Sequence, residues 1–235
     1  MKILGIESSA PSASAAVVED GKVICEFFAN TGLTHSVTLV HLISDALEFA
    51  GITVGELDGI SVAAGPGSFT GVRIGVAAAK GLAQKDNIPC IPVSTLSGIA
   101  YPLKDSDCVA VAVMDARCKQ VYTASFDCRF GEFNRLTDDR AIAIDELKEY
   151  IDSLDKTAVL IGDGADLVYG MLKDKCENLK ICSAQYRFQH ASSVALFGCE
   201  EYNKTKNRVT ADELVPVYLR PSQAEQLKNR NKKGE

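Results

Sequence analysis

The spacing of apolar residues along the chain predicts a series of strands and helices. Residues 2–30 hold three apolar runs that indicate three strands, and Asp20–Gly21 supplies the tight turn between the last two. From residue 36 to 50, apolar residues recur at helical spacing, and Gly51 ends that helix. The chain then continues with a buried strand over 57–65, a helix over 71–84, a short strand over 89–94 and a helix that begins near residue 94.

The second half of the chain repeats this order. Residues 108–136 again indicate strand, strand, glycine turn and strand, and a helix, a strand, a helix, a short strand and a helix from about residue 191 follow. Two halves with the series βββαβαβα predict a duplicated α/β fold, and the cleft between such halves is the natural ligand site. We therefore expect three parts, namely residues 1–104, residues 105–225 and a basic disordered tail over 226–235.

The composition restricts the classes of function. With 235 residues and 46% hydrophobic content the chain can bury a sizeable core, and its net charge of −6 makes a general attraction to nucleic acid unexpected. No run approaches the roughly 20 apolar residues that a membrane helix needs, and Glu7 interrupts the first apolar run, so we expect neither a span nor a signal peptide. Eight scattered cysteines without a CxxC pair favour free thiols and a cytoplasmic location.

The stretch GPGSFTGVRIG, residues 65–75, joins a strand to a helix, as phosphate-binding loops do. It fails both nucleotide motifs, because no lysine follows its last glycine and a threonine stands where the dinucleotide fingerprint needs glycine or alanine. Gly71, Gly75 and Ala79 lie four residues apart, so one helix face is almost bare and lets another segment approach closely. That segment belongs either to a partner protein or to this same chain, and the sequence leaves both open.

Two acids and two of the three histidines are the candidates for chemistry. Glu7 and Asp115 each end the first strand of their half, where they suit metal–phosphate chemistry or, alternatively, turn and cap hydrogen bonds. The residues after them, SSAPSAS and ARCKQ, lack the glycines of a phosphate loop, so we expect no catalytic residue. His35 and His41 are six residues apart, about 120° around a helix, and cannot share a metal ion, so we expect no metal site.

The chain resembles the TsaB (YeaZ) family in six segments: ILGIESSAPSASAAVV, HSVTLVHLISDAL, GPGSFTGVRIG, VSTLSGIA, MDARCKQVY and PVYLRPSQAE. These segments run from residue 3 to about residue 225. The resemblance implies the duplicated actin-like fold (ASKHA, RNase H-like). It also implies a role as the dimerisation subunit of the bacterial complex that forms N6-threonylcarbamoyladenosine (t6A) in tRNA, at the adenosine next to the anticodon. The related catalytic subunit TsaD binds metal through histidines four residues apart; here Thr38 and Leu39 stand where the second would be, which implies a non-catalytic partner.

The resemblance further implies that the chain pairs with TsaD, or with a second copy when alone, through the helices over 36–50 and 71–84. Replacing Gly75 with leucine is then expected to abolish pairing while the monomer stays folded. The residues expected at this interface are Leu39, Val40, Ile43, Leu47, Gly71, Arg73, Ile74, Gly75, Ala78 and Ala79.

The same resemblance implies a TsaE-like ATPase within the complex and contact with tRNA only through the complex. It implies no tightly bound cofactor, with ATP or ADP placed at the interface of the complex if at all. Two alternatives stay open. The first is an ATP-dependent transferase or kinase of the actin-like superfamily that uses Glu7 and Asp115. The second is a glycoprotease-like peptidase, for which the chain offers neither paired metal-binding histidines nor a nucleophile with its base.

Overall fold

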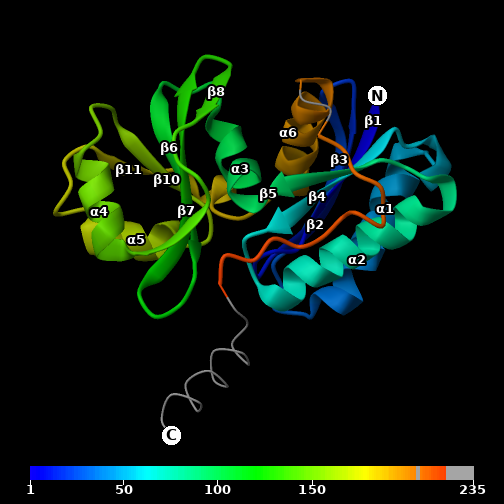
Figure 1. The fold of residues 1–235 in the computed structure, drawn as a ribbon, viewed down its shortest axis with the longest axis horizontal. Coiled ribbons are helices and arrows are strands. Elements are labelled where there is room, and N and C mark those ends of the chain that lie inside the picture. The colour runs from blue at the N-terminus through cyan, green and yellow to red at the C-terminus, as the bar shows by residue number, and fades with distance from the viewer. Residues whose placement is uncertain (205–206, 221–235) are drawn as a thin grey trace, which may run out of the picture.

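The computed structural model describes residues 1–204 and 207–220, and the predicted tail over 226–235 lies outside them (Figure 1). The first sheet has five strands in the order β3-β2-β1-β4-β5. The first three strands form the predicted antiparallel meander, and the turn between β2 and β3 holds Asp20 and Gly21 at positive φ. Strands β4 and β5 join in parallel. The bounds are β1 Lys2–Glu7, β2 Ala13–Glu19, β3 Lys22–Ala29, β4 Gly59–Gly65 and β5 Cys90–Ser94.

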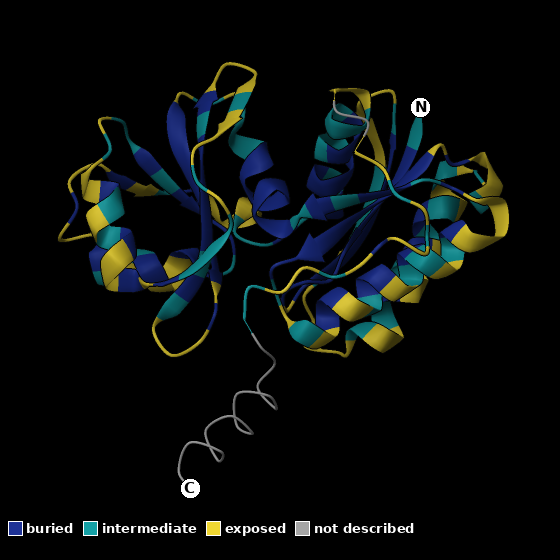
Figure 2. Ribbon diagram, in the orientation of Figure 1, coloured by how far each residue is buried: buried dark blue, intermediate teal, exposed yellow. Residues whose placement is uncertain are grey.

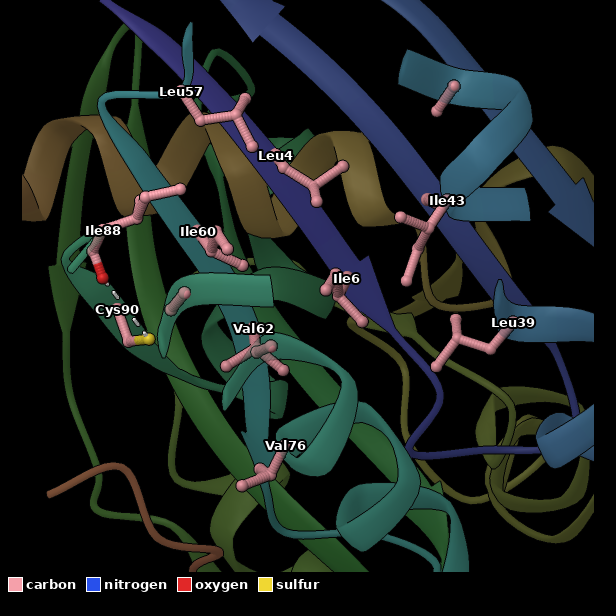
Figure 3. Packing of buried hydrophobic residues seen from close by; sticks show 14 of the residues in the cluster. Leu4, Ile6, Leu39, Ile43, Leu57, Ile60, Val62, Val76, Ile88 and Cys90 are labelled. Carbon is pink, nitrogen blue, oxygen red and sulfur yellow. Dashed lines mark hydrogen bonds between the residues drawn. The ribbon is translucent and has the colours of Figure 1, made fainter. Parts of the chain in front are cut away.

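Two long helices cover one face of this sheet: α1, His35–Ala50, and α2, Phe69–Asp86. Figure 3 shows Leu39 and Ile43 of α1 and Val76 of α2 directed toward Ile6 and Val62 of the sheet, and each of the five is at most 4% exposed. Burial of one such side chain stabilises a fold by about 1.5–3 kcal/mol. The opposite faces of both helices are exposed (Figure 2).

The second sheet repeats the strand order of the first. Its strand order β8-β7-β6-β10-β11 corresponds strand by strand to β3-β2-β1-β4-β5, which confirms the duplicated α/β fold. Strand β9 was not predicted, because its four residues are too few to display an alternating pattern; it pairs with β7. The elements are β6 Cys108–Asp115, β7 Gln120–Arg129, β8 Glu132–Arg135, β9 Arg140–Ala143, β10 Ala158–Ile161 and β11 Leu179–Ile181, with helices α4 Ile144–Asp152 and α5 Ala165–Leu172.

The last helix of each half packs against the sheet of the other half. The short α3, Thr95–Ala100, lies on β6 and β7, and α6, Ala191–Lys204, covers the second face of the first sheet. The approach of α6 is close, because a Cβ on Gly5 of β1 would stand 2.2 Å from the carbonyl oxygen of Ala191. These contacts cross the boundary expected near residue 104, because the five-stranded sheet needs α6 to bury its second face.

Residues 207–220 also return to the first half. Val209 forms an antiparallel bridge with Cys90, and the amide of Val217 donates to the carbonyl of Ala64 at 2.7 Å.

Within residues 1–204 and 207–220, no helix combines the length and apolar character needed to cross a membrane. All eight cysteines are free. Short 3-10 turns complete the described structure: η1 Val54–Glu56, η2 Tyr101–Leu103 and η3 Ala184–Tyr186.

Candidate functional site

A cleft of about 940 Å³ opens between the two halves. Its walls are the loop after β1, the N-terminal turn of α2, the end of β6 with the turn that follows, and the segment that returns from α6. Acidic, basic and aromatic side chains all line it. Those that enter the argument below are Ser9, His35, Phe69, Asp115, Arg117, Cys118, Asp163, Tyr218 and Arg220.

Glu7 lies at the end of the central strand β1, where its side chain is only 1% exposed. Its Oε1 accepts a hydrogen bond from the amide of Ser9 at 2.6 Å, so the carboxylate closes the loop that follows its own strand. Burial raises the pKa of Glu7 to about 7, against the hydrogen bonds from Ser9, which lower it. The residue is therefore part of the floor beneath the cleft rather than a group that projects into it.

Asp115 takes the corresponding place at the end of β6 but is exposed. Its Oδ1 accepts the amide of Arg117 at 2.7 Å, the same turn-closing contact that Glu7 makes. A third acid, Asp163, follows β10 and was missed in the sequence, although the GDG stretch after a buried strand is a signal that could have found it. Burial, together with a smaller contribution from the negative charge of Asp115, raises the pKa of Asp163 to about 6. The negative charge of Asp163 in turn raises the pKa of Glu7, so the structure brings Glu7, Asp163 and Asp115 near one another along the cleft floor.

Hydrogen bonds within the chain engage groups of both loops above these acids. In the first half, the hydroxyl of Ser8 donates to the carbonyl of Gly71 at 2.9 Å, and the carbonyl of Ser9 accepts the amide of Ser68 at 2.6 Å. In the second half, three consecutive residues adopt positive φ with full side chains, and the first two line the cleft: Arg117, Cys118 and Lys119. The first loop is therefore held by its bonds to α2, and the second by the bond from the amide of Arg117 to Asp115.

The glycine face of α2 packs against this chain, and the expectation that it is a docking surface was wrong. A Cβ on Gly71 would stand 2.1 Å from the carbonyl oxygen of Ser8, and one on Gly75 would stand 2.6 Å from the Ser8 hydroxyl. Only glycine permits the loop after β1 to approach the helix so closely. Replacing Gly75 with leucine would therefore disturb the fold itself, so this substitution cannot test pairing.

The ten residues that the sequence assigned to an interface divide into two groups. Five are buried in the chain's own core and cannot contact a partner: Leu39, Ile43, Gly71, Gly75 and Ala79. The other five keep exposed surface, with Val40 and Arg73 exposed and Leu47, Ile74 and Ala78 half-buried. The reason is that an amphipathic stripe in a sequence marks the face toward the sheet, whereas a partner meets the opposite face.

Part of the exposed side of these two helices is nevertheless apolar, beside exposed polar residues such as His41 and Glu48 of α1. On α1, Val37 and Val40 are 58% and 62% exposed. On α2, Ala77 and Gly81 are exposed and Ile74 and Ala78 are half-buried, and nothing lies within 4 Å of a Cβ on Gly81. We call these six residues the α1–α2 face. Its side chains are small or β-branched, so this surface is nearly flat, and none of its six residues is charged.

The histidines do not gather. His35 contacts the carbonyl of Ala10 through Nε2 at 2.7 Å, and His41 is exposed on α1. His190 contacts Glu26 on β3. Over the described ranges 1–204 and 207–220, no group of three or more His, Cys, Asp and Glu residues has a geometry that could hold a metal ion.

Comparison with known proteins gives consistent matches. A family model described as TsaD, tRNA N6-adenosine threonylcarbamoyltransferase, matches residues 29–227. The chain is 30% identical over 226 residues to the tRNA threonylcarbamoyladenosine biosynthesis protein TsaB of Bacillus subtilis, and the alignment covers 96% of each. It is 33% identical over 170 residues to the tRNA N6-adenosine threonylcarbamoyltransferase of Lacticaseibacillus casei, which covers 61% of this chain and 47% of that protein. The solved structure of YeaZ from Pseudomonas aeruginosa shares the fold with a TM-score of 0.78 at 22% identity, over 93% of this chain and 99% of that one. With the strand order above, this likeness confirms the actin-like fold class.

Proposed function

This chain belongs to the TsaB family of tRNA threonylcarbamoyladenosine biosynthesis proteins, and on that premise we propose that it is a subunit of the machinery that forms t6A in tRNA. The observation that carries the proposal is the match to TsaB over nearly the whole of both chains. The relative that is named as the transferase is matched over only 47% of its length, so this chain corresponds to about half of such a protein.

We propose further that the chain does not perform the transfer itself. The two acids at the strand ends are engaged by the amides of Ser9 and Arg117, and the glycine stretch is filled by the loop after β1. These contacts support a cleft that has no role in bond formation. They weigh equally against the alternatives of an ATP-dependent transferase or kinase and of a glycoprotease-like peptidase. ATP or ADP, if it takes part, is then held at an interface of the complex rather than by this chain alone.

The partner in this proposal is a TsaD-type catalytic subunit that docks on the α1–α2 face. A specific interface buries about 800 Å² on each side, an area that the outer faces of two helices of 16 and 18 residues can supply. The face combines two exposed valines with alanines and an open glycine, which allows a partner helix to pack closely. In the absence of TsaD the same face would pair two copies of this chain. A TsaE-like ATPase would join the complex, and tRNA would be reached only through it.

The test is co-purification with the TsaD protein of the same genome, followed by a t6A-forming assay. We expect Val40→Glu and Ala77→Glu each to weaken pairing more than tenfold, because a charge buried at the contact loses its hydration. Both sites are exposed, so neither variant should lower the melting temperature. Leu167→Glu is the matched control, since Leu167 is an exposed helical residue of α5 in the second half. Wild-type pairing by both face variants would rule out this surface, and t6A formation at full rate without the chain would rule out the function.

A further inference from the structure

The segment that returns from α6 runs along α2 (Figure 1), and its residues 217–220 line the cleft. We call residues 209–220 the strap. The side chain of Lys80 on α2 donates to the carbonyls of Asp212 and Leu214, at 3.2 and 3.0 Å, and the amide of Val217 donates to Ala64 at the end of β4. The strap is thus fastened along the first half, beside the α1–α2 face.

Arg73 connects this strap to the exposed surface of α2. Its guanidinium lies 3.9 Å above the ring centroid of Phe69, and its Nε donates to the hydroxyl of Tyr218 at 2.7 Å. The ring of Tyr218 also stacks on Phe69, with centroids 4.6 Å apart. The same arginine is exposed at the edge of the α1–α2 face. A protein that covers that face would therefore exclude water from the bond between Arg73 and Tyr218.

Arg220 carries the connection across the cleft. Its Nη1 donates to the carbonyl of Ala116 at 2.9 Å, and Ala116 begins the turn that follows β6 in the second half. This turn includes the three consecutive residues at positive φ, a conformation that costs about 1 kcal/mol or more for each. Bonds within the turn offset part of this cost, such as the one from the amide of Gln120 to the carbonyl of Arg117 at 3.0 Å, and Arg220 adds one from the strap.

We infer that Arg73, Tyr218 and Arg220 form a clasp through which the α1–α2 face controls the attachment of the 116–119 turn across the cleft. Docking on the face shields the bond between Arg73 and Tyr218 from water, and a shielded hydrogen bond is stronger. The strap then holds Arg220 in place, and Arg220 holds the turn. The clasp is a property of this chain alone; only the identity of the docking protein rests on the proposed function.

Hydrogen exchange of the full chain, read by mass spectrometry, tests the clasp. Tyr218→Phe removes the hydroxyl and keeps the ring, and Arg220→Ala removes the far contact. Each should speed exchange in a peptide spanning the 116–119 turn by about two- to tenfold, the range expected for one lost hydrogen bond. The matched control is Tyr202→Phe, because Tyr202 accepts a hydrogen bond from Arg208 at 2.8 Å in an arginine–tyrosine pair that does not involve the strap's end. If the exchange rate of the 116–119 turn in Tyr218→Phe equals that of wild type, the inference is wrong, even if Arg220→Ala speeds exchange.

A second arm adds the TsaD-type protein, with coelution measured first. In the wild type, binding should slow exchange in the 116–119 turn, and in Tyr218→Phe it should not. A bound complex in which the turn exchanges as in the free protein would overturn the coupling. Absence of coelution would contradict the proposed function, while the clasp would still be decided by the isolated chain.

Discussion

The packing of the glycine face of α2 can be tested by making one substitution at two places in the same helix. Gly71→Ala would place a Cβ 2.1 Å from the carbonyl oxygen of Ser8 and 3.3 Å from Cδ2 of His35. Gly81→Ala would place a Cβ in open space, with nothing within 4 Å. Both changes replace glycine with alanine in α2, so the difference between them reports chiefly on the contact with the loop after β1.

The magnitudes follow from the two environments. Alanine is favoured over glycine inside a helix by about 0.8–1.0 kcal/mol, so Gly81→Ala should raise the free energy of unfolding by about that amount. At Gly71 a smaller gain, in the first turn of the helix, is opposed by overpacking, which costs about 1–3 kcal/mol, because a backbone carbonyl must move. That shift also strains the bond from the Ser8 hydroxyl to the Gly71 carbonyl. We expect Gly71→Ala to be less stable than wild type, and less stable than Gly81→Ala by about 2 kcal/mol or more.

Urea unfolding followed by far-ultraviolet circular dichroism measures both variants, since the chain has no tryptophan to serve as a fluorescent probe. A thermal melt gives a parallel reading, with about 2–4 °C expected for each kcal/mol in a chain of this size. If Gly71→Ala gains as much stability as Gly81→Ala, the glycine face does not pack closely against Ser8 and the reasoning above is refuted.

Two further predictions concern the pH dependence of stability. The pKa of Glu7 is raised from 4.5 to about 7 by burial, so the stability that its protonated form contributes is complete below pH 4.5 and falls as the pH rises through 7, by about 3 kcal/mol. Glu7→Gln should remove this loss, and equal slopes for variant and wild type between pH 5 and 8 would contradict it. The pKa of His190 is raised above 6.5 by its hydrogen bond to Glu26, so the ion pair stabilises the fold below pH 6.5 and is lost as the pH rises through the raised value. The advantage of wild type over His190→Asn should be larger at pH 6 than at pH 8, by about 1 kcal/mol or less; an advantage constant with pH would argue against the pair.

The strands and helices could be predicted because their signals are local. The run that became β6 is apolar at nearly every position, since both faces of that strand are covered, and the apolar stripe of α1 keeps helical spacing over its whole length. The repetition of these signals in both halves predicted the duplicated fold. Strand β9 escaped because it has four residues and its identity depends on pairing with β7.

The candidate site was only partly predictable. Glu7 and Asp115 could be found because each ends a recognisable strand, whereas Asp163 joins them only through the parallel pairing of β10 with β6. The clasp could not be predicted either, because its central hydrogen bond joins Arg73 to Tyr218, which are 145 positions apart in the sequence. Nothing in the residues beside either one indicates the other.

The order of elements, the duplicated architecture and the two helices that carry the exposed face were therefore determined by the sequence alone. The tertiary structure decided what the glycines of α2 are for, which sheet α6 covers and which residues of α1 and α2 are exposed. Apolar residues that recur at helical spacing show that one face of a helix will be buried, but not which part of the molecule will cover it. Gly71 meets Ser8, 63 positions away, because the parallel pairing of β1 with β4 places the segments that follow these two strands at the same edge of the sheet. A contact of that kind belongs to the packing of the entire molecule, and no local pattern contains it.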